Sequence, residues 1–189
     1  MKVVIDTSSL IALVRYYLPF DKDDTLKNFF QKKVETKEII VIDKVHEESK
    51  YVAQKIVVNQ LDFINTKGNT VNTTDLLPFP KFYNILDNQL CNKLIKKMKN
   101  LDETEYEKQK FEYLNSADGK LISYCLREKK QNTILTGKII LVTEETSSEN
   151  DSKLFKKLPA CCSVLEIENC NLPNLFENHY NIKLSQYLK

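Results

Sequence analysis

Three short runs of apolar residues constrain the fold of this 189-residue chain more than any other feature. They lie at residues 2–5, 39–42 and 139–143, and each gives way to polar residues at its end. Unbroken apolar runs of this length are typical of strands that are buried on both faces, as in the centre of a parallel sheet. Segments with helical periodicity separate the runs, so the pattern predicts an α/β fold with a central, mostly parallel sheet.

Apolar residues at helical spacing predict helices between these strands. One helix ends at Pro19, a second begins at Asp23 or Asp24 and runs through Lys33, and a third runs from Asp43 to about residue 61. Near the end of the chain, the apolar residues of 162–167 predict a final edge strand, and a short helix is expected from Leu172 onward. Helices on both faces of the sheet would give three layers.

Residues 66–114 predict an insertion into this alternating pattern. Gly68, Pro78 and Pro80 make residues 66–81 the clearest loop in the chain. Helical periodicity then predicts helices at 82–99 and 103–114, which we expect to form a hairpin. No linker is visible, and the length favours a single domain that covers residues 1–189.

Four acidic residues are expected to meet at one edge of the sheet. Asp6 and Glu145 follow directly after strands, and Glu48 and Asp118 lie in the early turns of helices. In parallel sheets the carboxyl ends of the strands and the starts of the following helices share one side, where binding crevices form. Carboxylates brought close together need a cation, and their oxygen atoms suit Mg²⁺ or Mn²⁺.

Each acid taken alone also has a simpler interpretation. Asp6 is a candidate helix cap, and Asp118 is a first-turn acid that the helix dipole favours. Glu48 and Glu145 are candidate solvated surface acids. The set as a whole favours the metal site. A polar loop is expected at residues 146–152, and its acids Glu149 and Asp151 are interpreted as surface residues.

Four segments resemble, in chain order, the acidic motifs of the PIN-domain (VapC-like) nuclease superfamily. They are residues 4–11, 45–48, 117–122 and 141–145, which read VIDTSSLI, VHEE, ADGKLI and LVTEE. The closest resemblance is to a bacterial PIN-like family, DUF4411. In that family a strand ending in Val-Thr-x-Glu precedes a segment with Pro and Cys, as at residues 159–162 here.

The resemblance implies a three-layer α/β/α PIN-like fold and a metal-dependent endoribonuclease. It implies that the catalytic and metal-binding residues are Asp6, Glu48, Asp118 and Glu145, with Mg²⁺ or Mn²⁺ as the cofactor. It implies that Thr143 holds a water molecule or a substrate oxygen. The implied partners are an RNA substrate, an antitoxin protein and a second copy of the chain, with the protein as the toxin of a toxin-antitoxin pair.

Two departures from the PIN pattern leave the glutamates open. PIN proteins often have Asp where this chain has Glu145, and Ser49 stands where an aliphatic residue usually follows the second acid. The choices between Glu47 and Glu48 and between Glu144 and Glu145 therefore stay open.

Two other functions remain in view. One is a PIN-fold binding module without activity. The other is a phosphatase of the haloacid-dehalogenase kind, which needs a second Asp where this chain has Ser8.

Composition sets only broad limits. The net charge of +2 neither requires nor excludes a nucleic-acid partner, although lysines cluster near residues 96–99, 127–130 and 156–157. No secretory signal and no membrane-spanning run is visible. The five cysteines are odd in number and lack the spacing of zinc sites, which favours a reducing, cytoplasmic location.

Overall fold

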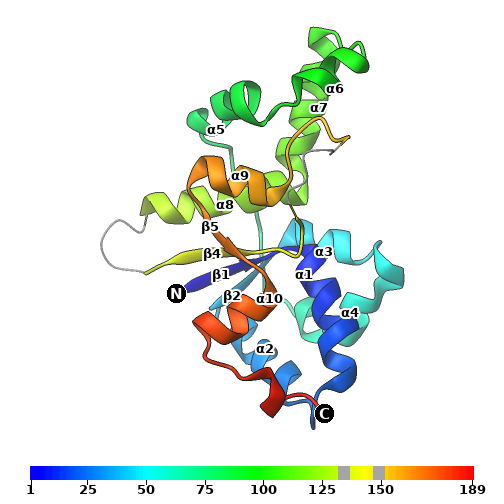
Figure 1. Cartoon of the computed structure of the whole chain (residues 1–189), viewed down its shortest axis with the longest axis vertical. Helices are drawn as coiled ribbons and strands as arrows, with labels where there is room; N and C mark the ends of the chain where they lie inside the picture. Colours follow the sequence, from blue (N-terminus) through cyan, green and yellow to red (C-terminus); the bar gives the residue numbers. More distant parts are fainter. Residues whose placement is uncertain (132–136, 147–151) are drawn as a thin grey trace.

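A five-stranded parallel sheet forms the centre of the computed structural model, which describes residues 1–131, 137–146 and 152–189 (Figure 1). The strands are β1 (Lys2–Ile5), β2 (Ile39–Ile42), β3 (Thr70–Val71), β4 (Ile139–Val142) and β5 (Glu168–Cys170). Their order is β3-β2-β1-β4-β5, and all four neighbouring pairs are parallel. The predicted α/β class with a parallel sheet is confirmed.

The three apolar runs become the three inner strands. Every residue of β2 and β4 is buried, and only Lys2 of β1 is partly exposed. Val3 pairs with Ile39 on one side and with Ile140 on the other, so β1 lies in the middle of the sheet. Strands buried on both faces need a cover of helices on each face, which is why these runs carry no alternating polar residues.

Helices cover both faces of the sheet, as the three-layer prediction requires. In Figure 1, α8 (Ala117–Gln131) and α9 (Leu158–Leu165) lie on one side of the sheet. On the other side lie α1 (Thr7–Ala12), α2 (Thr25–Glu35) and the C-terminal segment from α10 (Leu172–Asn174) onward. Short helical turns complete these layers at Leu13–Tyr17, Leu18–Phe20, Leu175–His179 and Leu184–Gln186. Among the described residues, no helix has the length and apolar content needed to cross a membrane.

The end of β1 leads directly into α1, and the end of β2 leads into α3 (Asp43–Ser49). Asp6 is the N-cap of α1 and keeps an extended backbone. Asp24, one of the two predicted caps, is the N-cap residue of α2, but its side chain makes no cap hydrogen bond. Both oxygens of Asp21 accept backbone hydrogen bonds instead, from Leu26 N and Lys27 N at 2.9 Å each.

The predicted helix from Asp43 to residue 61 is broken into two. After α3 the chain passes through a turn at Ala53–Lys55, and α4 (Ile56–Gln60) follows. Ala53, Gln54 and Lys55 all have positive φ angles, of 49°, 56° and 63°. Three successive left-handed residues cannot continue a right-handed helix. The segment contains neither Gly nor Pro, so no residue type in it indicates the break.

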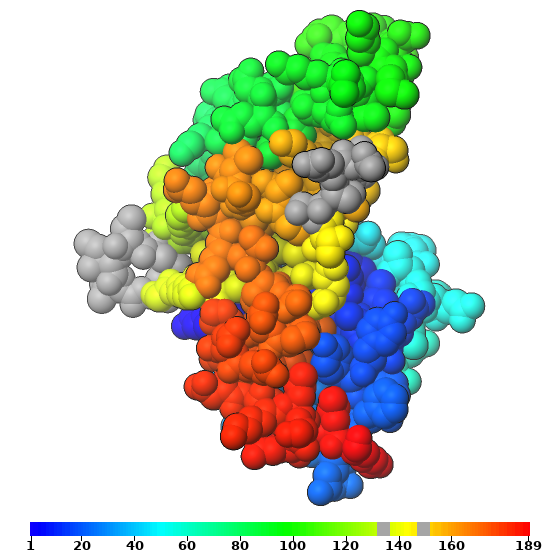
Figure 2. Space-filling model, viewed as in Figure 1, coloured from blue at the N-terminus to red at the C-terminus, as the bar shows by residue number. Residues whose placement is uncertain are grey.

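Residues 80–115 form a helical arm at one end of the molecule, drawn in green in Figures 1 and 2. The arm contains α5 (Pro80–Ile85), a turn at Leu86–Leu90, α6 (Lys93–Met98) and α7 (Glu103–Asn115). The helix expected at 82–99 is interrupted at residues 91–92. Asp87 holds the arm together because it accepts hydrogen bonds from Tyr106 Oη at 2.7 Å and from Lys110 Nζ at 2.8 Å.

The segment at Leu154–Lys156 attaches the arm to the rest of the chain. Asn92 N donates to Leu154 O at 2.7 Å, and Lys156 N donates to Leu90 O at 3.0 Å. The rings of Tyr113 and Phe155 pack with their centroids 4.7 Å apart. The arm is therefore tied to the short segment that leads into α9.

Two further predictions need correction near the sheet edges. The predicted loop at 66–81 contains the edge strand β3, whose two residues pair with Val41 and Ile42. The residues predicted as the last strand, 162–167, belong mainly to helix α9, and β5 begins only at Glu168. Pro159 lies in the first turn of α9, a position that suits proline because the missing N–H has no partner there.

A close contact between α7 and α8 sets the start of α8. Ser116 separates the two helices, and its hydroxyl accepts a hydrogen bond from Gly119 N at 3.4 Å. A Cβ atom on Gly119 would lie 2.3 Å from Tyr113 O and 2.7 Å from Leu114 Cα. Only glycine allows this approach, and the approach fixes Asp118 in the first turn of α8.

Candidate functional site

A pocket of about 290 Å³ lies at the carboxyl edge of the sheet, next to the ends of β1 and β4. The four acids selected from the sequence, Asp6, Glu48, Asp118 and Glu145, are all among the residues that line it. They come from the end of β1, from α3, from the start of α8 and from the segment after β4. The fold thus brings four separated segments to one place.

Asp6 is the most tightly held of the four acids. It is 5% exposed, and its Oδ1 accepts a hydrogen bond from Thr7 N at 2.6 Å. Its Oδ2 accepts bonds from Ser8 Oγ at 2.7 Å and from Thr143 Oγ1 at 3.0 Å. Burial raises the pKa of Asp6, while the bonds from Ser8 and Thr143 act in the opposite direction and Glu145 adds to the rise.

Glu48 faces the pocket, and its neighbour Glu47 does not. Glu48 Oε2 accepts a hydrogen bond from Thr7 Oγ1 at 2.6 Å, which ties α3 to the start of α1. Glu47 instead forms an ion pair with Lys44 at 2.8 Å on the outer surface of α3. Of the two glutamates that the sequence left open, Glu48 is therefore the one that lines the pocket.

Asp118 carries the strongest sign of charge crowding. It is half-buried in the first turn of α8. Burial, together with the negative charges of Asp6, Glu145 and Glu48, raises the pKa of Asp118 to about 7, and the charge of Lys153 partly offsets the rise. An additional cation in the pocket would reverse this shift.

Glu145 lines the pocket, and Glu144 is committed elsewhere. Glu144 Oε1 accepts a hydrogen bond from Leu172 N at 2.7 Å, at the start of α10. Glu145 Oε2 accepts a bond from Leu158 N at 3.3 Å, at the start of α9. In this pair, as in the first, one glutamate lines the pocket and the other makes its contact elsewhere.

Two hydroxyl groups behind Asp6 link it to the segment after β4. Thr143 Oγ1 donates to Asp6 and accepts from Glu145 N at 3.1 Å, while Ser8 Oγ donates to Asp6 and accepts from Glu144 N at 3.0 Å. Thr143 is 4% exposed and holds Asp6 and the Glu145 backbone together. Its predicted contact with a water molecule or substrate stays a prediction.

Lys153 is a pocket residue that the sequence did not single out. Its Nζ lies 3.7 Å from Glu145 Oε1, and the residue that follows, Leu154, bonds to the helical arm. No motif marks this lysine, because it reaches the pocket only through the path of the chain after β4. Glu149 and Asp151, the acids of the predicted polar loop at 146–152, lie outside the described residues.

The donor set suits a hard divalent ion that keeps part of its water shell. All four acids offer oxygen atoms, which Mg²⁺ and Mn²⁺ prefer. Within the described ranges, no group of three or more His, Cys, Asp or Glu side chains converges closely enough to hold an ion alone. Mg²⁺ commonly binds through one or two carboxylates and completes its shell with water, so the arrangement is compatible with such an ion.

Comparison with known proteins identifies one family. The model of a domain of unknown function, DUF4411, matches residues 3–182, which include all four acids and, except for Lys2 of β1, all five strands. No curated protein and no solved structure matches the chain.

Proposed function

The chain belongs to the DUF4411 family, a domain of unknown function, and we propose that it is a PIN-like, metal-dependent endoribonuclease. The observation that carries the proposal is the shared pocket of Asp6, Glu48, Asp118 and Glu145. These residues were selected by their resemblance to PIN motifs, and they come from four segments that are far apart in the sequence. Acids that serve only solubility are not expected to converge on one pocket from four separate segments.

The four carboxylates are the groups that would hold Mg²⁺ or Mn²⁺. Such an ion, when bound, stabilises the charge that develops on a phosphate and makes a water molecule more acidic. The raised pKa of Asp118 supports the assignment, because it reflects burial together with nearby negative charge that Lys153 only partly offsets. Cations are the natural guests of such a pocket.

The surrounding residues would keep the carboxylates in place. Ser8 and Thr143 fix one oxygen of Asp6, and Thr7 fixes one oxygen of Glu48. Partners of this kind orient the groups that bind a metal ion and support its affinity. Lys153 is the cation of the pocket that could contact a phosphate of the RNA backbone.

Cleavage of a labelled single-stranded RNA with Mg²⁺ or Mn²⁺ tests the proposal. We expect Asp6→Asn, Glu48→Gln and Asp118→Asn each to lower the cleavage rate by about 100-fold or more, since each removes a charged oxygen from the site. Glu47→Gln is the matched control, because Glu47 lies on the same helix but pairs with Lys44 outside the pocket. Equal cleavage by all five proteins, or none by the wild type with either ion, would overturn the proposal.

The resemblance also leads us to propose a toxin role with an antitoxin partner. Induced expression of the wild type is then expected to arrest the growth of a bacterial host, and Asp118→Asn, at the same expression level, is not. Growth arrest by both proteins would show that the toxicity does not depend on the acidic pocket. The proposed homodimer is tested by analytical ultracentrifugation of the purified chain.

A second candidate is a PIN-fold module that binds a partner without cleaving RNA. The specific observation in its favour is that, in the described part of the chain, no three potential ligands converge on one point. Calorimetry with Mn²⁺ separates the two functions. Binding that Asp118→Asn abolishes supports the nuclease, and no detectable binding to the wild type supports the module. The phosphatase alternative gains nothing, because Ser8 stands where it needs an acid and donates to Asp6.

A further inference from the structure

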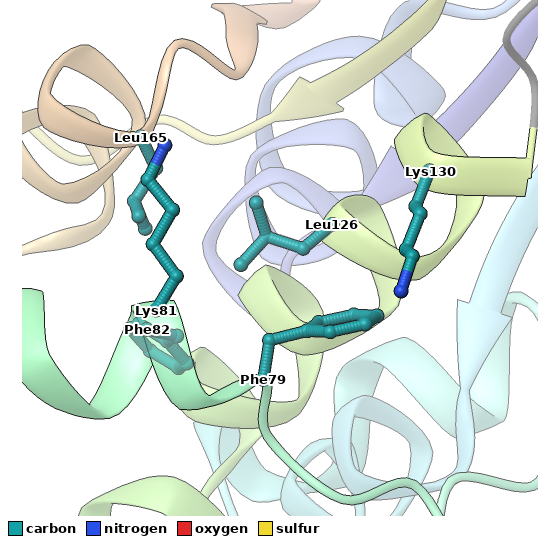
Figure 3. A pocket seen from close by; sticks show the side chains of 6 residues that line it. All are labelled: Phe79, Lys81, Phe82, Leu126, Lys130 and Leu165. Atoms are coloured by element: carbon teal, nitrogen blue, oxygen red, sulfur yellow. The ribbon is translucent and has the colours of Figure 1, made fainter.

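A second, smaller pocket lies between α5, α8 and α9, and it is chemically unlike the acidic one (Figure 3). Its volume is about 160 Å³, and its apolar surface comes from Phe79, Phe82, Leu126 and Leu165. Phe82 and Leu165 are buried, whereas Phe79 and Leu126 are partly exposed. Within the described part of the chain, the other residues that line it are two lysines.

The size and lining of the pocket restrict what it can accept. Pockets for cofactors and drug-sized ligands usually measure about 300–1,000 Å³. An apolar cavity of about 150 Å³ is large enough for a benzene ring. The pocket is therefore suited to one large apolar side chain. A nucleobase is a poorer fit, because its polar edges would find no hydrogen-bonding group on the apolar floor.

The rim of the pocket is positively charged. Figure 3 shows Lys81 and Lys130 on opposite sides of Leu126. Lys130 Nζ lies 5.3 Å from the centre of the Phe79 ring, and among the described residues neither lysine is paired with a carboxylate. Both lysines are exposed. A partner with acidic residues beside its apolar side chain would supply the missing charges.

The wall of the pocket is held in place before any partner arrives. Phe79 belongs to the segment between β3 and α5, and Lys120 of α8 fixes this segment from inside. Lys120 is 3% exposed, and its Nζ donates to Leu76 O at 2.9 Å and to Thr74 O at 3.5 Å. A preformed wall lowers the ordering cost of binding. Leu77, in the same segment, is 79% exposed.

From these observations, we infer that this pocket is a docking site for an acidic peptide segment of a partner protein. One large apolar side chain of the segment fills the pocket, and carboxylates on either side of it pair with Lys81 and Lys130. On α8, Leu126 and Lys130 lie about 12 and 18 Å along the helix from Asp118, at 1.5 Å per residue. The inference does not depend on nuclease activity, since the docking residues are separate from the four acids.

Fluorescence polarisation with designed peptides tests the inference on the full chain. The probe is a fluorescein-labelled nine-residue peptide with a central Phe and two Glu on each side. Two matched peptides carry Ala in place of the Phe or Lys in place of the four Glu. We expect the wild type to bind the first peptide at least tenfold more tightly than either of the others, because each control lacks one of the two contacts.

Protein variants locate the binding on the surface. Lys81→Glu with Lys130→Glu is expected to weaken binding of the Phe peptide at least tenfold. Lys97→Glu with Lys99→Glu is the matched control, since it makes the same charge change at exposed lysines of the arm. Leu126→Phe, which narrows the pocket without a charge change, is expected to weaken binding as well. A thermal melt confirms that each variant is folded.

Three results would overturn the inference. The first is no binding of the Phe peptide at millimolar concentration. The second is equal binding of all three peptides, or equal loss in both double variants. The third is binding of a nine-nucleotide single-stranded RNA that is lost in Lys81→Glu with Lys130→Glu but kept in the control. That last result would assign the surface to nucleic acid instead.

Discussion

Thr7 Oγ1 donates a 2.6 Å hydrogen bond to Glu48 Oε2, although 41 residues separate the two positions in the chain. The bond joins the first turn of α1 to α3, and both residues line the acidic pocket. Thr7 is 4% exposed, whereas Glu48 is an exposed residue that lines the pocket. A buried hydroxyl thus restrains an exposed carboxylate that would otherwise sample many rotamers.

Thr7→Val should weaken metal binding while leaving every carboxylate in place. Valine keeps the shape of threonine but cannot donate the bond, so Glu48 regains its rotamer freedom. We expect the affinity for Mn²⁺, measured by calorimetry, to fall by about tenfold, the lower end of the range for residues that orient metal ligands. Thr7→Ser keeps the hydroxyl and should retain most of the affinity. Equal affinities of both variants and the wild type would show that the bond is unimportant.

Asp118 should make the metal-free protein less stable as the pH rises. Its pKa in the folded protein is about 7, above the usual value of 3.8, so the folded state binds the proton more tightly than the unfolded chain. This contribution to stability is fully present below about pH 4 and is lost as the pH rises through about 7. Asp118→Asn cannot lose a proton, and it should melt about 4 °C or more above the wild type at pH 8.

Thermal melts in the presence of a chelator check this expectation. The two proteins should differ little at pH 4 and increasingly between pH 4 and 7. Asp23→Asn, a change at an exposed acid far from the pocket in the sequence, should show no such trend. Added Mn²⁺ should stabilise the wild type at pH 8 more than the variant. A melting temperature of Asp118→Asn below that of the wild type at pH 8 would contradict a raised pKa of Asp118 in the folded protein.

Lys153 should tune the acidity of Asp118. Its positive charge lowers the pKa of Asp118, and it also pairs with Glu145 at 3.7 Å. Lys153→Met should therefore raise the pKa of Asp118 above about 7 in the metal-free protein, and Lys153→Arg should leave it nearly unchanged. Carboxyl NMR titration measures the pKa directly. Lys156→Met is the control for charge loss in the same segment, and an equal rise in that variant would refute a specific effect.

Gly119→Ala should destabilise the protein, contrary to the usual effect in a helix. Alanine in place of an exposed helical glycine normally adds about 1 kcal/mol of stability. Here the added Cβ would lie 2.3 Å from Tyr113 O, and backbone atoms cannot move aside easily. We expect a loss of about 1–3 kcal/mol in urea unfolding. Lys129→Ala, at an exposed position of the same helix, should change stability by less than about 0.5 kcal/mol.

The three inner strands could be predicted from the sequence, because a strand that is buried on both faces is apolar along its whole length. The runs at 2–5, 39–42 and 139–142 could be recognised without their partners, since each is apolar throughout. The two edge strands have no such apolar run. β3 has only two residues, both partly exposed, and β5 has three, of which Glu168 and Asn169 are exposed. Short polar strands are determined by the neighbour with which they pair.

The prediction of a strand at 162–167 was wrong for a different reason. Cys161, Cys162 and Leu165 are all buried, and a short apolar run fits a buried helix as well as a strand. The position of Pro159 at the start of the run was the available sign of a helix.

The residues of the acidic pocket were predicted because their positions relative to strands and helices were informative. What the sequence could not provide was orientation. Glu47 and Glu48 are neighbours in one helix, and only the contacts with Lys44 and Thr7 separate the outer side chain from the inner one. Lys153 could not be found at all, because its place depends on the tertiary course of the chain.

The origin of the pocket in four separate segments has a consequence for how the protein is made. Glu145 is synthesised 139 positions after Asp6, and its partner Leu158 follows 13 positions later still. The pocket of a nascent chain therefore stays incomplete until these later segments have been made. Whatever chemistry the pocket performs, a chain that is still being made cannot perform it with the complete set of four acids.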